Sequence, residues 1–189
     1  MKKLTEKDYR ISDWSGGKTI QIAIAPESAQ YADRRFSWRL SSATVDLEES
    51  DFTSLPDYQR LIAPLRGEMR LTHNGGTPVD LRPYEVHRFD GADTTHSWGS
   101  CTDFNLMLRK GEWDGSISAP EGETVLCPEP GCETLIVYCT RGGAAVSCGD
   151  ESVELAEREA VLLADGPTQP VRLILSPGGR AMCAQVWKI

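Results

Sequence analysis

Histidine is scarce in this chain, and its scarcity limits the metal chemistry open to the protein. Three histidines occur, at His73, His87 and His96, and none belongs to an H-x-H pair. That spacing puts two imidazoles on one face of a β-strand, where both can reach the same metal ion. Only His87 and His96 together with Asp93 offer a ligand set, and their spacing gives it little support. We therefore expect neither a metal ion nor another cofactor.

Basic residues and long apolar runs are also in short supply. The chain has 20 Lys and Arg against 28 Asp and Glu, a formal net charge of −8. Nucleic acids and anionic membrane surfaces need a basic footprint, so we expect neither as a partner. No apolar stretch is long enough to span a bilayer, and residues 1–14 lack the apolar segment of a signal peptide. The sequence therefore predicts a cytoplasmic protein.

Common signatures of zinc sites and of catalysis are missing as well. The six cysteines include no C-x2-C pair, and we expect them to be reduced and mostly buried. GGKT at 16–19 resembles the end of a phosphate-binding loop, but Ser12 stands where that loop needs a glycine. No serine lies in a G-x-S-x-G elbow, and a buried thiol is a better interpretation of Cys101 than a nucleophile paired with His96. We assign no catalytic residue.

What the chain does contain is an internal repeat. One copy runs from Gly67 to Gly91 and the other from Gly142 to Gly166, with the two glycines equally far apart in each. Both copies have a short strand, a turn containing glycine, a V-[DE]-L segment and an apolar strand ending in Asp-Gly. Such repetition predicts two copies of one β-unit, a pair of double-stranded β-helices. We place the first barrel at residues 1–111 and the second at 112–189; an immunoglobulin-like sandwich is the alternative.

Three predicted strands carry pairs of polar residues at alternate positions. Because alternate residues of a strand share a face, each pair lies on one side of its strand. The pairs are Thr19 and Gln21, Arg39 and Ser41, and Asp103 and Asn105. If these faces converge inside an open barrel, they form a pocket in which Arg39 binds an anion. The alternatives are that the faces meet solvent, or that Asp103 and Arg39 pair with each other.

Five segments of the first 111 residues resemble the HutD/Ves family: WSGGKT (14–19), FSWRLSSATV (36–45), FTSLPDYQRLIAPLRGEM (52–69), PYEVHRFDG (83–91) and TDFNLMLRKG (102–111). The resemblance is weak beyond residue 112. It implies a metal-free bicupin, with two tandem cupin-like barrels of the RmlC-like jelly-roll type. It also implies an accessory role in histidine catabolism and a small anionic metabolite, such as urocanate or formylglutamate, as the ligand.

The family motif carries over onto particular residues of this chain. The motif positions are Trp14, Gly16, Gly17, Thr19, Trp38, Arg39, Ser41, Pro56, Arg60, Asp103, Phe104, Asn105 and Met107. The chain departs from many relatives in the short Trp14–Thr19 segment and in having Gln21 where a glutamate is common. Our predicted ligand-binding residues are Trp14, Thr19, Gln21, Trp38, Arg39, Ser41, Arg60, Asp103, Asn105 and Met107.

We interpret the protein as an all-β, non-catalytic bicupin that binds its ligand in the first barrel and uses the second for structure. One alternative is a metal-free isomerase or hydrolase in which Asp103 or a histidine acts as acid and base. Another is a protein–protein interaction module. The sequence leaves open whether the chain forms a homodimer.

Overall fold

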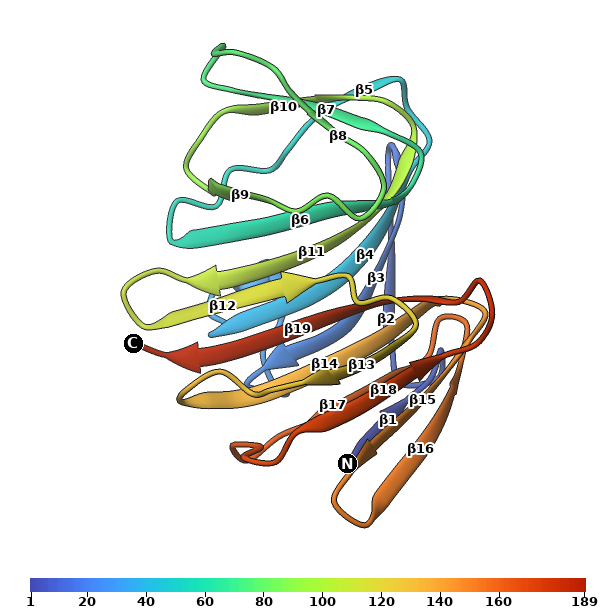
Figure 1. The fold of residues 1–189 in the computed structure, drawn as a ribbon. Coiled ribbons are helices and arrows are strands. Elements are labelled where there is room, and N and C mark those ends of the chain that lie inside the picture. Colours follow the sequence, from blue (N-terminus) through green and yellow to red (C-terminus); the bar gives the residue numbers. More distant parts are fainter. The chain divides into compact units, whose positions relative to one another are not determined.

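The computed structural model describes all 189 residues, and it is built almost entirely of β-strands. One short 3-10 helix, η1 (Tyr31–Asp33), interrupts the strands, and no helix could cross a membrane. The chain divides into two compact units. We call Arg10–Trp113 the N-terminal barrel, and Met1–Tyr9 together with Asp114–Ile189 the C-terminal barrel. Figure 1 shows the strands of both.

The N-terminal barrel consists of two antiparallel sheets. Its six-stranded sheet has the order β2 (Arg10–Trp14), β3 (Gly17–Ala25), β4 (Trp38–Val45), β11 (Cys101–Arg109), β6 (Tyr58–Arg66) and β9 (His87–Asp90). Its four-stranded sheet has the order β5 (Glu49–Asp51), β10 (Thr95–Trp98), β7 (Met69–His73) and β8 (Val79–Leu81).

The C-terminal barrel also consists of two antiparallel sheets. The five-stranded sheet has the order β1 (Lys2–Leu4), β17 (Ala160–Leu163), β14 (Cys132–Arg141), β19 (Arg180–Lys188) and β12 (Trp113–Ser118). The four-stranded sheet has the order β13 (Glu123–Leu126), β18 (Val171–Leu175), β15 (Gly143–Cys148) and β16 (Glu151–Ala156).

The two barrels share one strand order. The series β9-β6-β11-β4 corresponds to β17-β14-β19-β12, and β8-β7-β10-β5 corresponds to β16-β15-β18-β13. Gly67 and Gly142 occupy matching turns with φ of 74° and 73°. Gly91 N donates to Tyr58 O at 2.8 Å, and Gly166 N donates to Glu133 O at 3.1 Å. The two acceptors lie at the starts of the corresponding strands β6 and β14. The predicted all-β architecture of two related barrels is confirmed.

The division between the barrels differs from the predicted one at the N terminus. We assigned residues 1–111 to the first barrel, yet Leu4 of β1 pairs with Ala160 of β17, and residues 1–9 belong to the C-terminal barrel. The side chain of Leu4 is buried there. A three-residue strand such as KKL carries no local signal for the sheet edge that it joins, so tertiary pairing decided its place.

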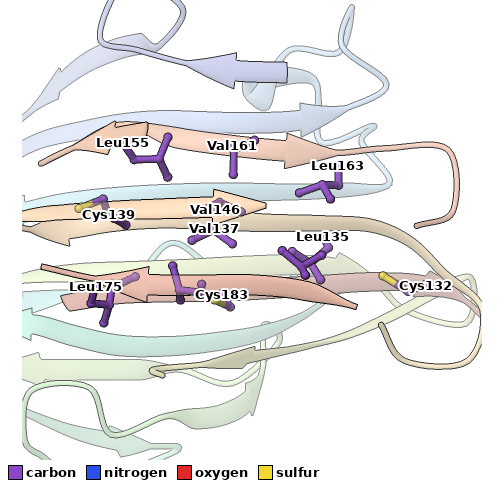
Figure 2. Packing of buried hydrophobic residues seen from close by; sticks show 14 residues of the cluster. Cys132, Leu135, Val137, Cys139, Val146, Leu155, Val161, Leu163, Leu175 and Cys183 are labelled. Carbon is purple, nitrogen blue, oxygen red and sulfur yellow. The ribbon is translucent and has the colours of Figure 1, made fainter. Parts of the chain in front are cut away.

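The interior of the C-terminal barrel is filled by small and medium apolar side chains. Alternation on β18 explains how: Val171, Leu173 and Leu175 are buried, whereas Arg172 and Ile174 are exposed. Figure 2 shows labelled members of this cluster, among them Leu135, Val137 and Cys183. The N-terminal barrel instead has two separate apolar clusters, one around Leu71 and one around Tyr58.

Candidate functional site

The site is built on one face of the six-stranded sheet of the N-terminal barrel. Across neighbouring strands, Gln21 pairs with Ser41 and Ser41 with Asn105. One repeat further along β11, Asp103 lies opposite Ala43, and Thr19 lies on the other side of Ala43. Because residues opposite each other in a sheet share a face, the polar pairs converge on one side.

A cavity of about 240 Å³ lies over this face. Eight of the ten predicted residues line it: Trp14, Thr19, Arg39, Ser41, Arg60, Asp103, Asn105 and Met107. Arg39 and Arg60 enter from β4 and β6, both opposite Met107 of β11. The three strands therefore bring together two basic side chains that are far apart in the sequence.

Gln21 and Trp38 do not line the cavity. Gln21 is buried and accepts a hydrogen bond from Arg39 Nε at 2.9 Å, so it orients the arginine. Trp38 immediately precedes Arg39 on β4, and neighbouring residues of a strand point to opposite faces. Its side chain is buried on the face turned away from the cavity. The motif thus combines cavity residues with one packing residue.

Arg39 is fixed by three neighbours. Its Nη1 donates to Ser41 Oγ at 3.0 Å, in addition to the bond with Gln21, and its guanidinium carbon lies 4.3 Å from the centre of the Tyr31 ring. Burial lowers the pKa of Arg39, while Tyr31 and Asp103 act in the opposite direction. The guanidinium is preorganised and poorly hydrated, which strengthens any charge-assisted hydrogen bond that it makes.

Arg60 is more weakly satisfied than Arg39. Its guanidinium carbon lies 4.8 Å from the ring centre of Phe52 and 5.0 Å from that of Phe89. Its Nε is buried and has no hydrogen-bond partner. Burial lowers the pKa of Arg60 to about 10, so the side chain remains charged at neutral pH.

Asp103 and Asn105 supply the acceptors of the cavity. Asp103 Oδ1 accepts a hydrogen bond from Ala43 N at 3.0 Å, and burial raises the pKa of Asp103 to about 6 despite that bond and the two arginines. Asp103 forms no ion pair with either arginine, although both charges lower its pKa, so Arg39 and Asp103 do not pair directly. Asn105 Oδ1 is buried without a partner.

Aromatic side chains from outside the polar strands complete the cavity. Tyr31 comes from η1 and Phe52 from the segment after β5, and both contact an arginine. Sequence reasoning missed them, because neither lies in an alternating strand and each reaches the site only through tertiary packing. One signal was available in the sequence. Only 7% of the residues are aromatic, and an aromatic ring can bind a guanidinium through its face.

The histidines lie outside this cavity. His73 Nε2 is 2.9 Å from His87 Nε2, and His73 Nδ1 is 2.9 Å from Thr95 Oγ1. Burial lowers the pKa of both His73 and His87. His96 instead contacts Asp51, with Nδ1 at 2.7 Å from Oδ1. No group of three or more His, Cys, Asp or Glu side chains is arranged to hold a metal ion.

Comparison with known proteins agrees with this architecture. The sequence model of the HutD family matches residues 6–181. The conserved protein of unknown function PA5104 from Pseudomonas aeruginosa PAO1 is 29% identical, with a TM-score of 0.84 over 99% of this chain and 97% of that one. HutD from Pseudomonas fluorescens SBW25, in a structure described as a formate condition, is 22% identical, with a TM-score of 0.80 over 100% and 98% of the two chains.

More distant structures share the fold alone. A cupin 2 conserved barrel domain protein from Leptotrichia buccalis is 8% identical, with a TM-score of 0.57 over 100% of this chain and 96% of that one. The predicted cupin-like fold is therefore confirmed. No curated protein matches the sequence.

Proposed function

Since this chain belongs to the HutD family, we propose that it is a small-molecule-binding protein whose N-terminal cavity takes a small anionic metabolite. One observation carries the proposal: two buried arginines, Arg39 and Arg60, face a cavity that contains a single buried carboxylate, Asp103. A buried charge is costly unless it is paired, and the buried side chains of the cavity carry more positive than negative charge. The other carboxylate of the lining, Asp51, is exposed and lies 2.7 Å from His96 Nδ1. A carboxylate ligand supplies the missing charge.

The unpaired Nε of Arg60 supports the same class of ligand. A guanidinium presents its N–H groups in a planar fork that matches a carboxylate, and Arg60 has a donor with no partner in the protein. The P. fluorescens HutD structure is described as a formate condition, and formate is the smallest carboxylate. We extend the proposal to urocanate-like or formylglutamate-like acids and to an accessory, metal-free role in histidine catabolism in the cytoplasm.

Calorimetric titration with formate, urocanate and formylglutamate tests the proposal. We expect Arg39→Ala to weaken binding by about 2–5 kcal/mol, part of which comes from leaving its partners unpaired. The matched control is Arg70→Ala. It removes an exposed arginine of β7 whose Nε lies 2.6 Å from Asp80 Oδ1. Equal affinity in wild type and Arg39→Ala, or no binding of any of the three acids, would contradict the proposal.

The raised pKa of Asp103 favours one second candidate. A buried carboxyl that titrates near neutrality beside a cavity is a frequent property of general acid–base catalysts. In that case the protein converts one of the same acids, and proton NMR of the mixture shows a new product that Asp103→Asn fails to form. Unchanged spectra after prolonged incubation would exclude catalysis on these acids.

A further inference from the structure

One side of the cavity carries the hydrogen-bond acceptors of Asp103 and Asn105, and we call it the acceptor side. The carboxylate proposed to bind Arg39 and Arg60 does not use these acceptors. Asp103 and Asn105 lie on the same face of β11, two residues apart. Asp103 accepts one hydrogen bond, at Oδ1 from Ala43 N, and its other carboxylate oxygen accepts none within the protein. Asn105 Oδ1 is buried and also unpartnered. An acceptor without a donor in a poorly hydrated cavity costs free energy, so the free carboxylate oxygen of Asp103 calls for a donor from the ligand.

The acceptor side is separated from the Arg39 guanidinium along the sheet. Hydrogen bonds to Ser41 and Gln21 hold that guanidinium over the level of Asn105, because Ser41 lies opposite Asn105. Asp103 lies one same-face repeat further along β11, which is about 7 Å in an extended strand. A four-carbon acid is long enough to reach from one group to the other.

We infer that the ligand is a monocarboxylate that carries an N–H donor at the end remote from its carboxylate. Of the acids proposed above, urocanate meets this description, and the dicarboxylate formylglutamate does not. This inference rests on the proposed anion binding by Arg39 and Arg60. The carboxylate binds the guanidinium groups, and the N–H group donates to the Asp103 carboxylate. A dicarboxylate of the same length places a second negative charge beside Asp103, and an ester places an acceptor against the Asp103 carboxylate. The cavity therefore rejects both, by repulsion in one case and by unpaired polar groups in the other.

Three probes of one length separate these possibilities. Succinamate ends in an amide, succinate in a second carboxylate, and monomethyl succinate in an ester. Calorimetric titration at pH 8 keeps the Asp103 carboxyl ionised, since its pKa is about 6. We expect the wild-type protein to bind succinamate roughly 10- to 100-fold more tightly than either of the other probes.

Variants then assign the selectivity to Asp103. Asp103→Asn removes the negative charge and adds a donor, so succinate gains affinity and the preference for succinamate falls by about 10-fold or more. The matched control, Asp57→Asn, changes an exposed aspartate outside the cavity and keeps the wild-type ranking. The ranking in the wild-type protein tests the inference even if Asp103→Asn does not fold.

The outcomes also separate this inference from the proposed function. If succinate or the ester binds as tightly as succinamate, and Arg39→Ala still weakens all three, the inference is overturned and anion binding stands. If none of the three probes binds, the inference is overturned. If formate, urocanate and formylglutamate fail as well, the proposed function fails with it.

Discussion

At the scale of single residues, the burial of the Asp103 carboxyl beside the cavity lowers the free energy of unfolding at neutral pH. The residue is 5% exposed, and its carboxyl interacts with the charges of Arg39 and Arg60 without an ion pair to either. Burial raises its pKa from 3.8 to about 6, so the folded protein holds that proton more tightly than the unfolded chain does. The contribution of this group to the free energy of unfolding is therefore greatest below about pH 4 and is lost as the pH rises to about 6.

This sign predicts that Asp103→Asn stabilises the protein at pH 8. The pKa difference corresponds to up to ~3 kcal/mol, and an asparagine Oδ1 can still accept the hydrogen bond from Ala43 N. We expect the gain in the free energy of unfolding to shrink steadily between pH 6 and pH 4. Urea unfolding at several pH values measures it.

The control for this experiment is Asp57→Asn at the exposed start of β6. It removes a carboxylate of the same type without burial, so its effect on the free energy of unfolding should be small. A loss of stability in Asp103→Asn at pH 8 would show that the carboxylate is better satisfied in the folded protein than its geometry indicates.

At the scale of elements, the turns after β6 and β14 depend on glycine for two different reasons. Gly67 and Gly142 both have positive φ, which costs an L-residue about 1–2 kcal/mol. A Cβ on Gly67 would also lie 2.4 Å from the backbone oxygen of Ser100, whereas a Cβ on Gly142 would meet the Ser176 hydroxyl at 2.8 Å. Ser100 directly precedes β11, and its backbone oxygen cannot rotate away as the Ser176 hydroxyl can.

We therefore expect a graded series of alanine substitutions. Gly75→Ala, with φ of 68° and no atom near the added Cβ, should cost about 1–2 kcal/mol. Gly142→Ala should cost somewhat more, because Ser176 Oγ also accepts a hydrogen bond from Gly143 N. Gly67→Ala should cost most, ~3 kcal/mol or more. Urea unfolding of the three variants gives the order, and equal losses would mean that the turn after β6 shifts freely.

At the scale of the whole molecule, the two barrels have the same strand order but different interiors. The C-terminal barrel is filled by an apolar cluster, while the N-terminal barrel keeps a cavity lined in part by members of its apolar clusters. Leu173 and Ile174 of β18 are adjacent, but the first is fully buried in the cluster and the second is 38% exposed. Substitutions at Leu173 and Ile174 therefore measure how much the apolar interior contributes to the free energy of unfolding.

We predict that Leu173→Ala lowers the free energy of unfolding by about 2–5 kcal/mol, because it leaves a hole in a close-packed interior. Ile174→Ala should cost less than ~1 kcal/mol. Neither should change the affinity for formate at temperatures where the protein is folded. Thermal unfolding followed by circular dichroism and a formate titration provide the two readouts. A loss of formate affinity in Leu173→Ala would show that the C-terminal barrel contributes to binding as well as to structure.

Local pattern by itself determined much of this protein. The repeat of glycines and V-[DE]-L segments was sufficient to predict two related β-barrels, because turns that need positive φ and strands that alternate are written in short stretches of sequence. Alternation likewise grouped Thr19 with Gln21, Arg39 with Ser41, and Asp103 with Asn105, since residues two apart on a strand share a face.

Only the tertiary structure decided which of those strand faces lines the cavity and which distant segments complete its lining. Both faces of β4 are buried: Arg39 and Ser41 line the cavity, while Trp38 and Leu40 are buried on the other side. Alternation says that two faces differ and does not say which is inside. Tyr31 reaches the cavity from a short 3-10 helix, and residues 1–9 join the C-terminal barrel through β1. Both placements depend on contacts between segments distant in the chain, and no local pattern encodes those contacts.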